Sequence, residues 1–140
     1  MKILLAVDGS ENSLRAVKQA VRLARELAKP PRLTLFHASA PLLPQAERKL
    51  GAEATARYYG EEAELAVGKA RAALRRARVA FDERLVAGEP AAAIVEAARG
   101  GRYDQIVMGS RGQGALQGLL LGSVASKVLA GCDIPVLVVR

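Results

Sequence analysis

Gly109-Ser110-Arg111-Gly112, then nine residues, then Gly122-Ser123: this stretch separates an apolar run at 105–108 from a helical pattern at 123–129. The apolar run predicts a buried strand. A glycine-rich turn lets the backbone approach a ligand closely, and a helix that starts at Ser123 adds free N–H groups and the positive end of its dipole. Strand, glycine loop and helix start are suited to holding a phosphate. The chain has neither of the common phosphate motifs, G-x-x-x-x-G-K-S/T and G-x-G-x-x-G. The spacing alone is therefore not specific, because glycines that only make turns would give it too.

Outside this stretch, apolar runs alternate with helical patterns along the whole chain. The expected strands are 3–7, 33–38, 81–86, 105–108 and 134–139. The expected helices run from Ser10 to about Lys29, along the later part of the segment after Ser39, from Pro90, and from Ser123. This β-α-β-α-β-α-β-α-β order predicts an α/β fold: one open, doubly wound parallel sheet of five strands with helices on both faces, as a single domain over 1–140.

Such a sheet predicts where a ligand would bind. In open α/β sheets, ligands lie beyond the carboxyl ends of strands, where the strand order reverses. Asp8 follows the first strand and the glycine loop follows the fourth, so the two share one crevice if these strands are neighbours. Asp8 would then bond a ribose or base, or reach a phosphate-bound magnesium. Alternatively, Asp8 caps a helix or makes an Asx turn, and both roles can coexist.

Composition and charge narrow the class of protein. Apolar residues make up 51% of the chain and charged residues 25%, which is typical of a soluble globular domain, and no stretch is long enough to span a membrane. Cys132 is the only cysteine, which excludes an intrachain disulfide and favours the cytoplasm. The net charge of +7 comes from scattered basic residues, and only 4% of residues are aromatic, which disfavours nucleic-acid binding.

Five motifs carry a family resemblance. They are Val7-Asp8-Gly9-Ser10, Phe36-His37-Ala38, residues 106–112, Leu121-Gly122-Ser123-Val124, and residues 134–139. With these motifs the chain resembles, over its whole length, the universal stress proteins of the UspA family. The nucleotide-binding branch of that family carries G-x2-G-x9-G-S/T, which Gly109, Gly112, Gly122 and Ser123 fill here. The resemblance implies the Rossmann-like strand order 3-2-1-4-5 and binding of ATP.

The resemblance also implies which residues bind ATP. Main-chain groups near Val7 and Ala38 would meet adenine, and Asp8 would contact the nucleoside. The residues that would line the ribose and phosphates are Met108, Gly109 and Gly112. Those that would hold the phosphates are Arg111, Gly122, Ser123 and Val124. Mg2+ would bind through the phosphates, with no catalytic residue and no metal ligand from the protein.

Two of these positions depart from the family pattern. Many relatives have His where Arg111 stands and Val where Ala38 stands. Arg111 suits phosphate charge, or else is a free surface arginine. His37 sits in the strand pattern and is expected to be structural.

The expected function is that of a cytoplasmic, ATP-binding regulatory or stress-response protein. We expect slow ATP hydrolysis at most and no enzyme, because no residue offers a strong general base beside the glycine loop. One alternative is an ATP-dependent enzyme of a related α/β fold, although such enzymes usually carry an SGGxDS-like loop or an HxGH motif after the first strand. This chain has Asp8-Gly9-Ser10-Glu11 there. The other alternative is a nucleic-acid-binding protein.

The last strand predicts a homodimer. Ile134–Val139 is almost wholly apolar, and the strand order implied by the resemblance places it at the sheet edge. A bare apolar edge invites pairing, and Pro135, which lacks an N–H, fits an edge position. The alternative is a lone edge strand covered by its own helices. The sequence points to no particular protein partner.

Overall fold

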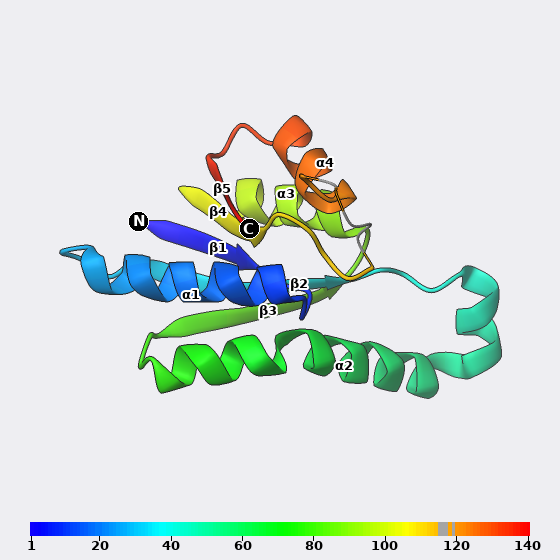
Figure 1. The fold of residues 1–140 in the computed structure, drawn as a ribbon. Helices are drawn as coiled ribbons and strands as arrows, with labels where there is room; N and C mark the ends of the chain where they lie inside the picture. Colours follow the sequence, from blue (N-terminus) through cyan, green and yellow to red (C-terminus); the bar gives the residue numbers. More distant parts are fainter. Residues whose placement is uncertain (115–117, 119) are drawn as a thin grey trace.

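A computed structural model describes residues 1–114, 118 and 120–140. It contains one five-stranded sheet with the order β3-β2-β1-β4-β5, in which all neighbouring strands are parallel. Helices lie on both faces of the sheet (Figure 1). The predicted fold class and strand order are therefore confirmed. Along the chain the elements are β1 (Lys2–Ala6), α1 (Glu11–Glu26), β2 (Arg32–Ser39), α2 (Pro44–Arg76), β3 (Phe81–Ala87), α3 (Pro90–Gly100), β4 (Gln105–Gly109), α4 (Ser123–Gly131) and β5 (Val136–Val139).

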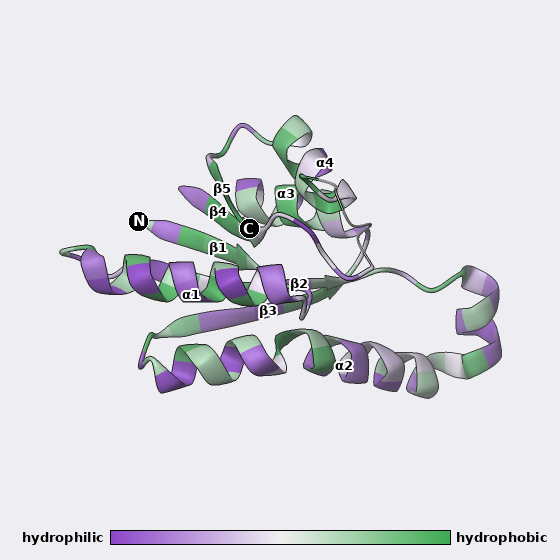
Figure 2. Cartoon of the chain, viewed as in Figure 1, coloured by the Kyte–Doolittle hydropathy of each residue, from purple (hydrophilic) through white to green (hydrophobic). Residues whose placement is uncertain are grey.

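The sheet separates two apolar cores. Successive side chains of a strand point to opposite faces, and a parallel sheet covered on both faces needs apolar side chains in both directions. Ile3 and Leu5 therefore pack under α1 and α2, whereas Leu4 and Ala6 pack under α3 and α4. Figure 2 shows hydrophobic colouring along β1 and alternating polar and apolar faces on α1. No helix in the described part of the chain combines the length and the apolar character needed to cross a membrane.

α1 begins as the sequence predicts and ends earlier. Ser10 is its N-cap, with the side-chain hydroxyl accepting the N–H of Ser13 at 3.2 Å. The helix stops at Glu26 rather than near Lys29, and Leu27 is already extended (φ −77°, ψ 134°). Two prolines follow, at 30 and 31. Pro30 has no N–H to donate to the Glu26 carbonyl, so a helix continued through Lys29 would lack a hydrogen bond of its last turn.

α2 is two helices joined at Gly51, whose φ of 78° and ψ of 167° are not helical. The first part projects beyond the sheet in Figure 1. The second part packs on the sheet through Ala66, Val67 and Ala70. Arg71 in this second part donates a hydrogen bond from Nε to a carboxylate oxygen of Glu83 in β3 at 2.9 Å.

The edge strands differ slightly from their predicted bounds. β3 runs one residue further than expected, to Ala87. β5 begins at Val136 rather than Ile134, because Pro135 has no N–H with which to enter the ladder. The Pro135 carbonyl still accepts the N–H of Ile106 at 2.9 Å. β5 lies at the sheet edge, as the predicted strand order requires.

Candidate functional site

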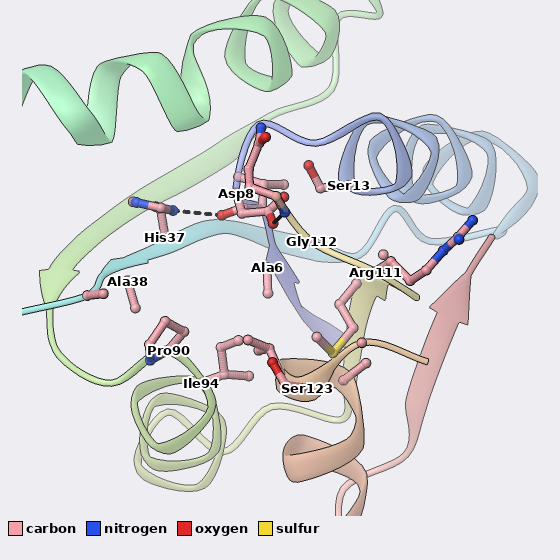
Figure 3. Close-up of a pocket in the computed structure, with 18 of the residues that line it drawn as sticks. Ala6, Asp8, Ser13, His37, Ala38, Pro90, Ile94, Arg111, Gly112 and Ser123 are labelled. Atoms are coloured by element: carbon pink, nitrogen blue, oxygen red, sulfur yellow. Dashed lines mark hydrogen bonds between the residues drawn. The ribbon is translucent and has the colours of Figure 1, made fainter. Parts of the chain in front are cut away.

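A cavity of about 540 Å³ opens at the carboxyl ends of β1, β2 and β4. This is the place where the strand order reverses, because the chain leaves β1 toward β2 on one side and later returns to β4 on the other. Figure 3 shows His37 and Ala38 at one end of the cavity, with Arg111 and Ser123 at the other. Pro90 and Ile94 of α3 lie along its lower side in this view.

The structure brings all ten predicted site residues to this one cavity. They come from the ends of three strands, from the glycine loop and from the start of α4. These lining residues are Val7, Asp8, Ala38, Met108, Gly109, Arg111, Gly112, Gly122, Ser123 and Val124.

The start of α4 presents main-chain donors to the cavity. Gly122 is the N-cap, and no described side chain caps this end of the helix. The N–H groups of Ser123, Val124 and Ala125 have no acceptor within a regular helix, and all three residues line the cavity. The Gly122 N–H donates to the Ser110 carbonyl at 2.7 Å, which closes the glycine loop against the helix start. The arrangement offers an anion several donors and the positive end of the α4 dipole.

Asp8 holds the turn after β1 and also reaches the glycine loop. Its Oδ1 accepts the N–H of Ser10 at 3.0 Å, the bond of an Asx turn. Its Oδ2 accepts the N–H of Gln113 at 3.0 Å. A Cβ on Gly112 would come within 2.5 Å of the same oxygen, so glycine permits the approach. Asp8 therefore has the turn role that was left open, while Ser10 supplies the helix cap.

Gly109 has a structural reason to be glycine. A Cβ at this position would lie 2.7 Å from Asn12 C and 2.7 Å from Ser13 N. Both atoms are main chain in the first turn of α1, so no side-chain rotation relieves the contact. The first glycine of the motif is needed for α1 to pack on β4, whatever the loop binds.

The main chain of Arg111 lies at the cavity, whereas its guanidinium points away from the cavity (Figure 3). The Arg111 carbonyl accepts a hydrogen bond from the Ser10 hydroxyl at 3.3 Å, which ties the loop to the start of α1. The side chain makes no ion pair with any residue that the structure describes. A contact with phosphate would require the side chain to change rotamer.

His37, Ser39 and Glu62 form a polar cluster at the other end of the cavity. His37 is only 5% exposed; its Nδ1 lies 2.8 Å from the Val7 carbonyl oxygen and its Nε2 3.1 Å from Glu62 Oε2. Ser39 donates its hydroxyl to the same carboxylate oxygen. Burial by itself raises the pKa of Glu62, but the hydrogen bonds from Ser39 and His37 outweigh it and hold that pKa below its ordinary value.

Sequence reasoning missed Glu62. Three acidic residues, Glu61, Glu62 and Glu64, lie together in α2, and nothing local marks one of them as a cavity residue. Only the packing of α2 against β2 brings Glu62 to His37. His37 was expected to be structural, and its bond to the Val7 carbonyl is of that kind.

Known proteins resemble this chain in both sequence and fold. The model of the universal stress protein family matches residues 1–140. A universal stress protein of Thermus aquaticus is 42% identical over 138 residues, covering 99% of this chain and 97% of its own. The solved structure of protein MJ0577 superposes with a TM-score of 0.78 at 30% identity, covering 99% and 94% of the two chains.

Two further solved structures hold nucleotides. A universal stress protein in complex with cAMP has a TM-score of 0.72 at 26% identity and covers 100% of this chain and 97% of its own. A universal stress protein of Archaeoglobus fulgidus in complex with dAMP has a TM-score of 0.72 at 25% identity, with coverages of 100% and 98%. Fold and full-length sequence similarity agree, and the chain belongs to the universal stress protein family.

Proposed function

We propose that this protein binds ATP, with Mg2+ on the phosphates, in the cavity between β1, β2 and β4. The observation that carries the proposal is the uncapped start of α4, which faces the cavity across the closed glycine loop. Backbone donors at a helix start favour phosphate. The opposite end has apolar walls at Ala38, Pro90 and Ile94, which suit a base. The cAMP and dAMP complexes of related proteins support an adenine nucleotide.

The ten residues keep the roles that the resemblance implies. The main chain at Val7 and Ala38 would meet adenine, and Asp8 would lie beside the nucleoside. Met108, Gly109 and Gly112 would line the ribose and first phosphate. Arg111 and the start of α4 would hold the remaining phosphates. In this arrangement the bound nucleotide would reach from the end of β2, past the ends of β1 and β4, to the start of α4.

The proposed action is regulatory rather than catalytic. ATP would bridge the glycine loop and the end of β2, so binding would bias the arrangement of these two segments and the surface they present. The protein would act in the cytoplasm as a homodimer. The carboxylate next to the glycine loop, that of Asp8, already accepts one main-chain N–H on each oxygen. Such a carboxylate is poorly placed to take a proton from an attacking water.

Replacing Arg111 with alanine is expected to weaken ATP more than adenosine. A hydrogen bond to a charged group contributes roughly 1.5–3 kcal/mol, so the loss for ATP is about 10–100-fold. Adenosine, which has no phosphate, should bind both proteins equally. Calorimetric titrations of wild type and variant with both ligands measure the difference. An equal loss for the two ligands would show that Arg111 does not act through phosphate.

ATP turnover by the isolated protein is expected to be far below the enzyme median of about 10 per second. The physical reason is the engaged carboxylate of Asp8, since hydrolysis needs a base that can orient and deprotonate water. Steady-state phosphate release with Mg2+ present measures the rate. Rapid release that disappears in Asp8→Asn would contradict the regulatory proposal.

The free edge of β5 is suited to pairing with a second copy. The carbonyl of Pro135 accepts the N–H of Ile106, and that of Val139 accepts the N–H of Ser110. The main-chain groups of Pro135 and Val139 therefore face β4. Successive residues of a strand direct their main-chain groups to opposite sides, and Val136 and Val138 therefore turn their N–H and C=O groups away from the sheet. Antiparallel pairing of these groups about a two-fold axis would make an isologous contact.

A dimer mass, twice 14.8 kDa, is therefore expected in light scattering at micromolar concentration. An interface of this kind typically buries about 1,200–2,000 Å² in total. Val138→Pro removes an N–H that faces outward and leaves the ladder to β4 intact, so it should shift the mass toward the monomer. A monomer mass for the unmodified protein would rule out this dimer as a stable species.

A further inference from the structure

Glu62 lies where a nucleobase would end. It lines the cavity beside His37 and Ala40, on the β2 side of β1, whereas the glycine loop lies on the β4 side. Its side chain is 37% exposed, so the carboxylate is open to the cavity rather than sealed in the core. A ligand with phosphates at α4 and its base toward Ala38 would extend toward this carboxylate.

The hydrogens of His37 and Ser39 determine which oxygen of the Glu62 carboxylate is already engaged. The Val7 carbonyl can only accept, so His37 must carry hydrogen on Nδ1 and donate it. The facing pair, Nε2 and Glu62 Oε2 at 3.1 Å, then shares one further proton. Ser39 donates to the same oxygen. Oε2 is thus engaged by the Ser39 hydroxyl and by the proton shared with His37, and hydrogen bonding lowers the pKa of Glu62, which favours its ionised form.

The second oxygen, Oε1, remains as an acceptor. No hydrogen bond from the described residues reaches it. An ionised carboxylate oxygen can accept and cannot donate. It therefore favours a ligand group that carries N–H and repels one that carries a carbonyl oxygen. A base that covers Oε1 also removes it from water, so a carbonyl at that place would leave two acceptors facing each other without a proton, which weakens binding.

Resting on the proposed function, we propose that Glu62 is a specificity residue that selects adenine over 6-oxo purines. Its Oε1 accepts a hydrogen bond from the exocyclic amine of adenine. Guanine and hypoxanthine carry an oxygen at the same ring position, which turns a lone pair toward the carboxylate, and their nearest N–H, on N1, lies at the neighbouring ring position. His37 and Ser39 act as positioning residues, since they hold Oε2 and leave Oε1 for the base.

The test compares ATP with ITP, whose base has a carbonyl in place of the amine and a hydrogen on the neighbouring N1. Wild-type protein should bind ATP about 10–100-fold more tightly than ITP. Glu62→Ala removes the acceptor, and water in its place can serve either base as donor or acceptor. The ratio of the two affinities should therefore fall by about the same factor.

Glu61→Ala is the matched control, because it removes the same charge from the neighbouring exposed residue that does not line the cavity. Its ratio should equal that of wild type. A wild-type protein that binds both nucleotides equally overturns the proposal without any variant, and so does an unchanged ratio in Glu62→Ala. A wild-type protein that binds neither nucleotide contradicts the proposed function itself.

Discussion

Gly122→Val is expected to abolish ATP binding in calorimetry while the protein remains folded. Gly122 caps α4 and closes the loop through its N–H bond to the Ser110 carbonyl at 2.7 Å. A Cβ on Gly122 would lie 3.2 Å from Arg111 Cα and 3.5 Å from the Ser110 carbonyl oxygen. A branched side chain would force these main-chain segments apart. The donors of the loop and of α4 would then no longer converge on one phosphate position.

The backbone of Gly122, with φ −78° and ψ 170°, is one that any residue adopts, so the effect would come from the added atoms. Gly60→Val is the control, because a Cβ there meets nothing within 4 Å and the residue does not line the cavity. It should leave the affinity for ATP unchanged. Thermal unfolding of both variants checks that each is folded. Full affinity in Gly122→Val would place the nucleotide elsewhere.

Gly109→Ala is expected to lower the free energy of unfolding by about 1–3 kcal/mol, at the upper end of that range. The new Cβ would stand 2.7 Å from two main-chain atoms of the first turn of α1. Main chain cannot rotate away as a side chain can. α1 would therefore have to shift from β4, although it is held by Ala16, Val17 and Ala20 in the core. Urea unfolding monitored by circular dichroism measures the loss.

Gly88→Ala is the matched control for this change. Gly88 also stands at the end of a strand, and a Cβ there would meet Ala93 Cβ at 3.7 Å, an ordinary contact. Its effect on stability should be small. If Gly109→Ala costs no more than Gly88→Ala, α1 does not approach β4 as closely as described.

The layers of the fold could be predicted from the sequence because they depend on local patterns. Apolar runs such as Ile3–Val7 predict buried strands, and Ser10 predicts the start of α1. The exact ends are harder to predict, because one residue can decide them and the apolar pattern does not mark it. Gly51 is an example, since its φ of 78° and ψ of 167° break α2 at a position that the pattern does not single out. The early end of α1 is another, because the apolar pattern continues to Ala28 although Leu27 is already extended.

The candidate site, too, could be predicted only in part from the sequence. The glycine loop and Asp8 stand next to strand ends in the sequence, so their meeting follows from the strand order alone. Glu62 comes from the middle of a long helix, and its place depends on how α2 crosses the sheet. The tight packing that makes glycine necessary at 109 likewise depends on α1, almost a hundred residues earlier.

Amide NMR spectra of the labelled protein, titrated with ATP and Mg2+, test nucleotide binding at this cavity most directly. We expect saturable shifts with a micromolar midpoint at Gly112, Ser123, Val124 and Ala38. These residues lie at both ends of the cavity, so their joint response would show the phosphate end and the base end occupied by one ligand. No saturable shift, or shifts confined to the arginines at the end of α2, would contradict the proposal.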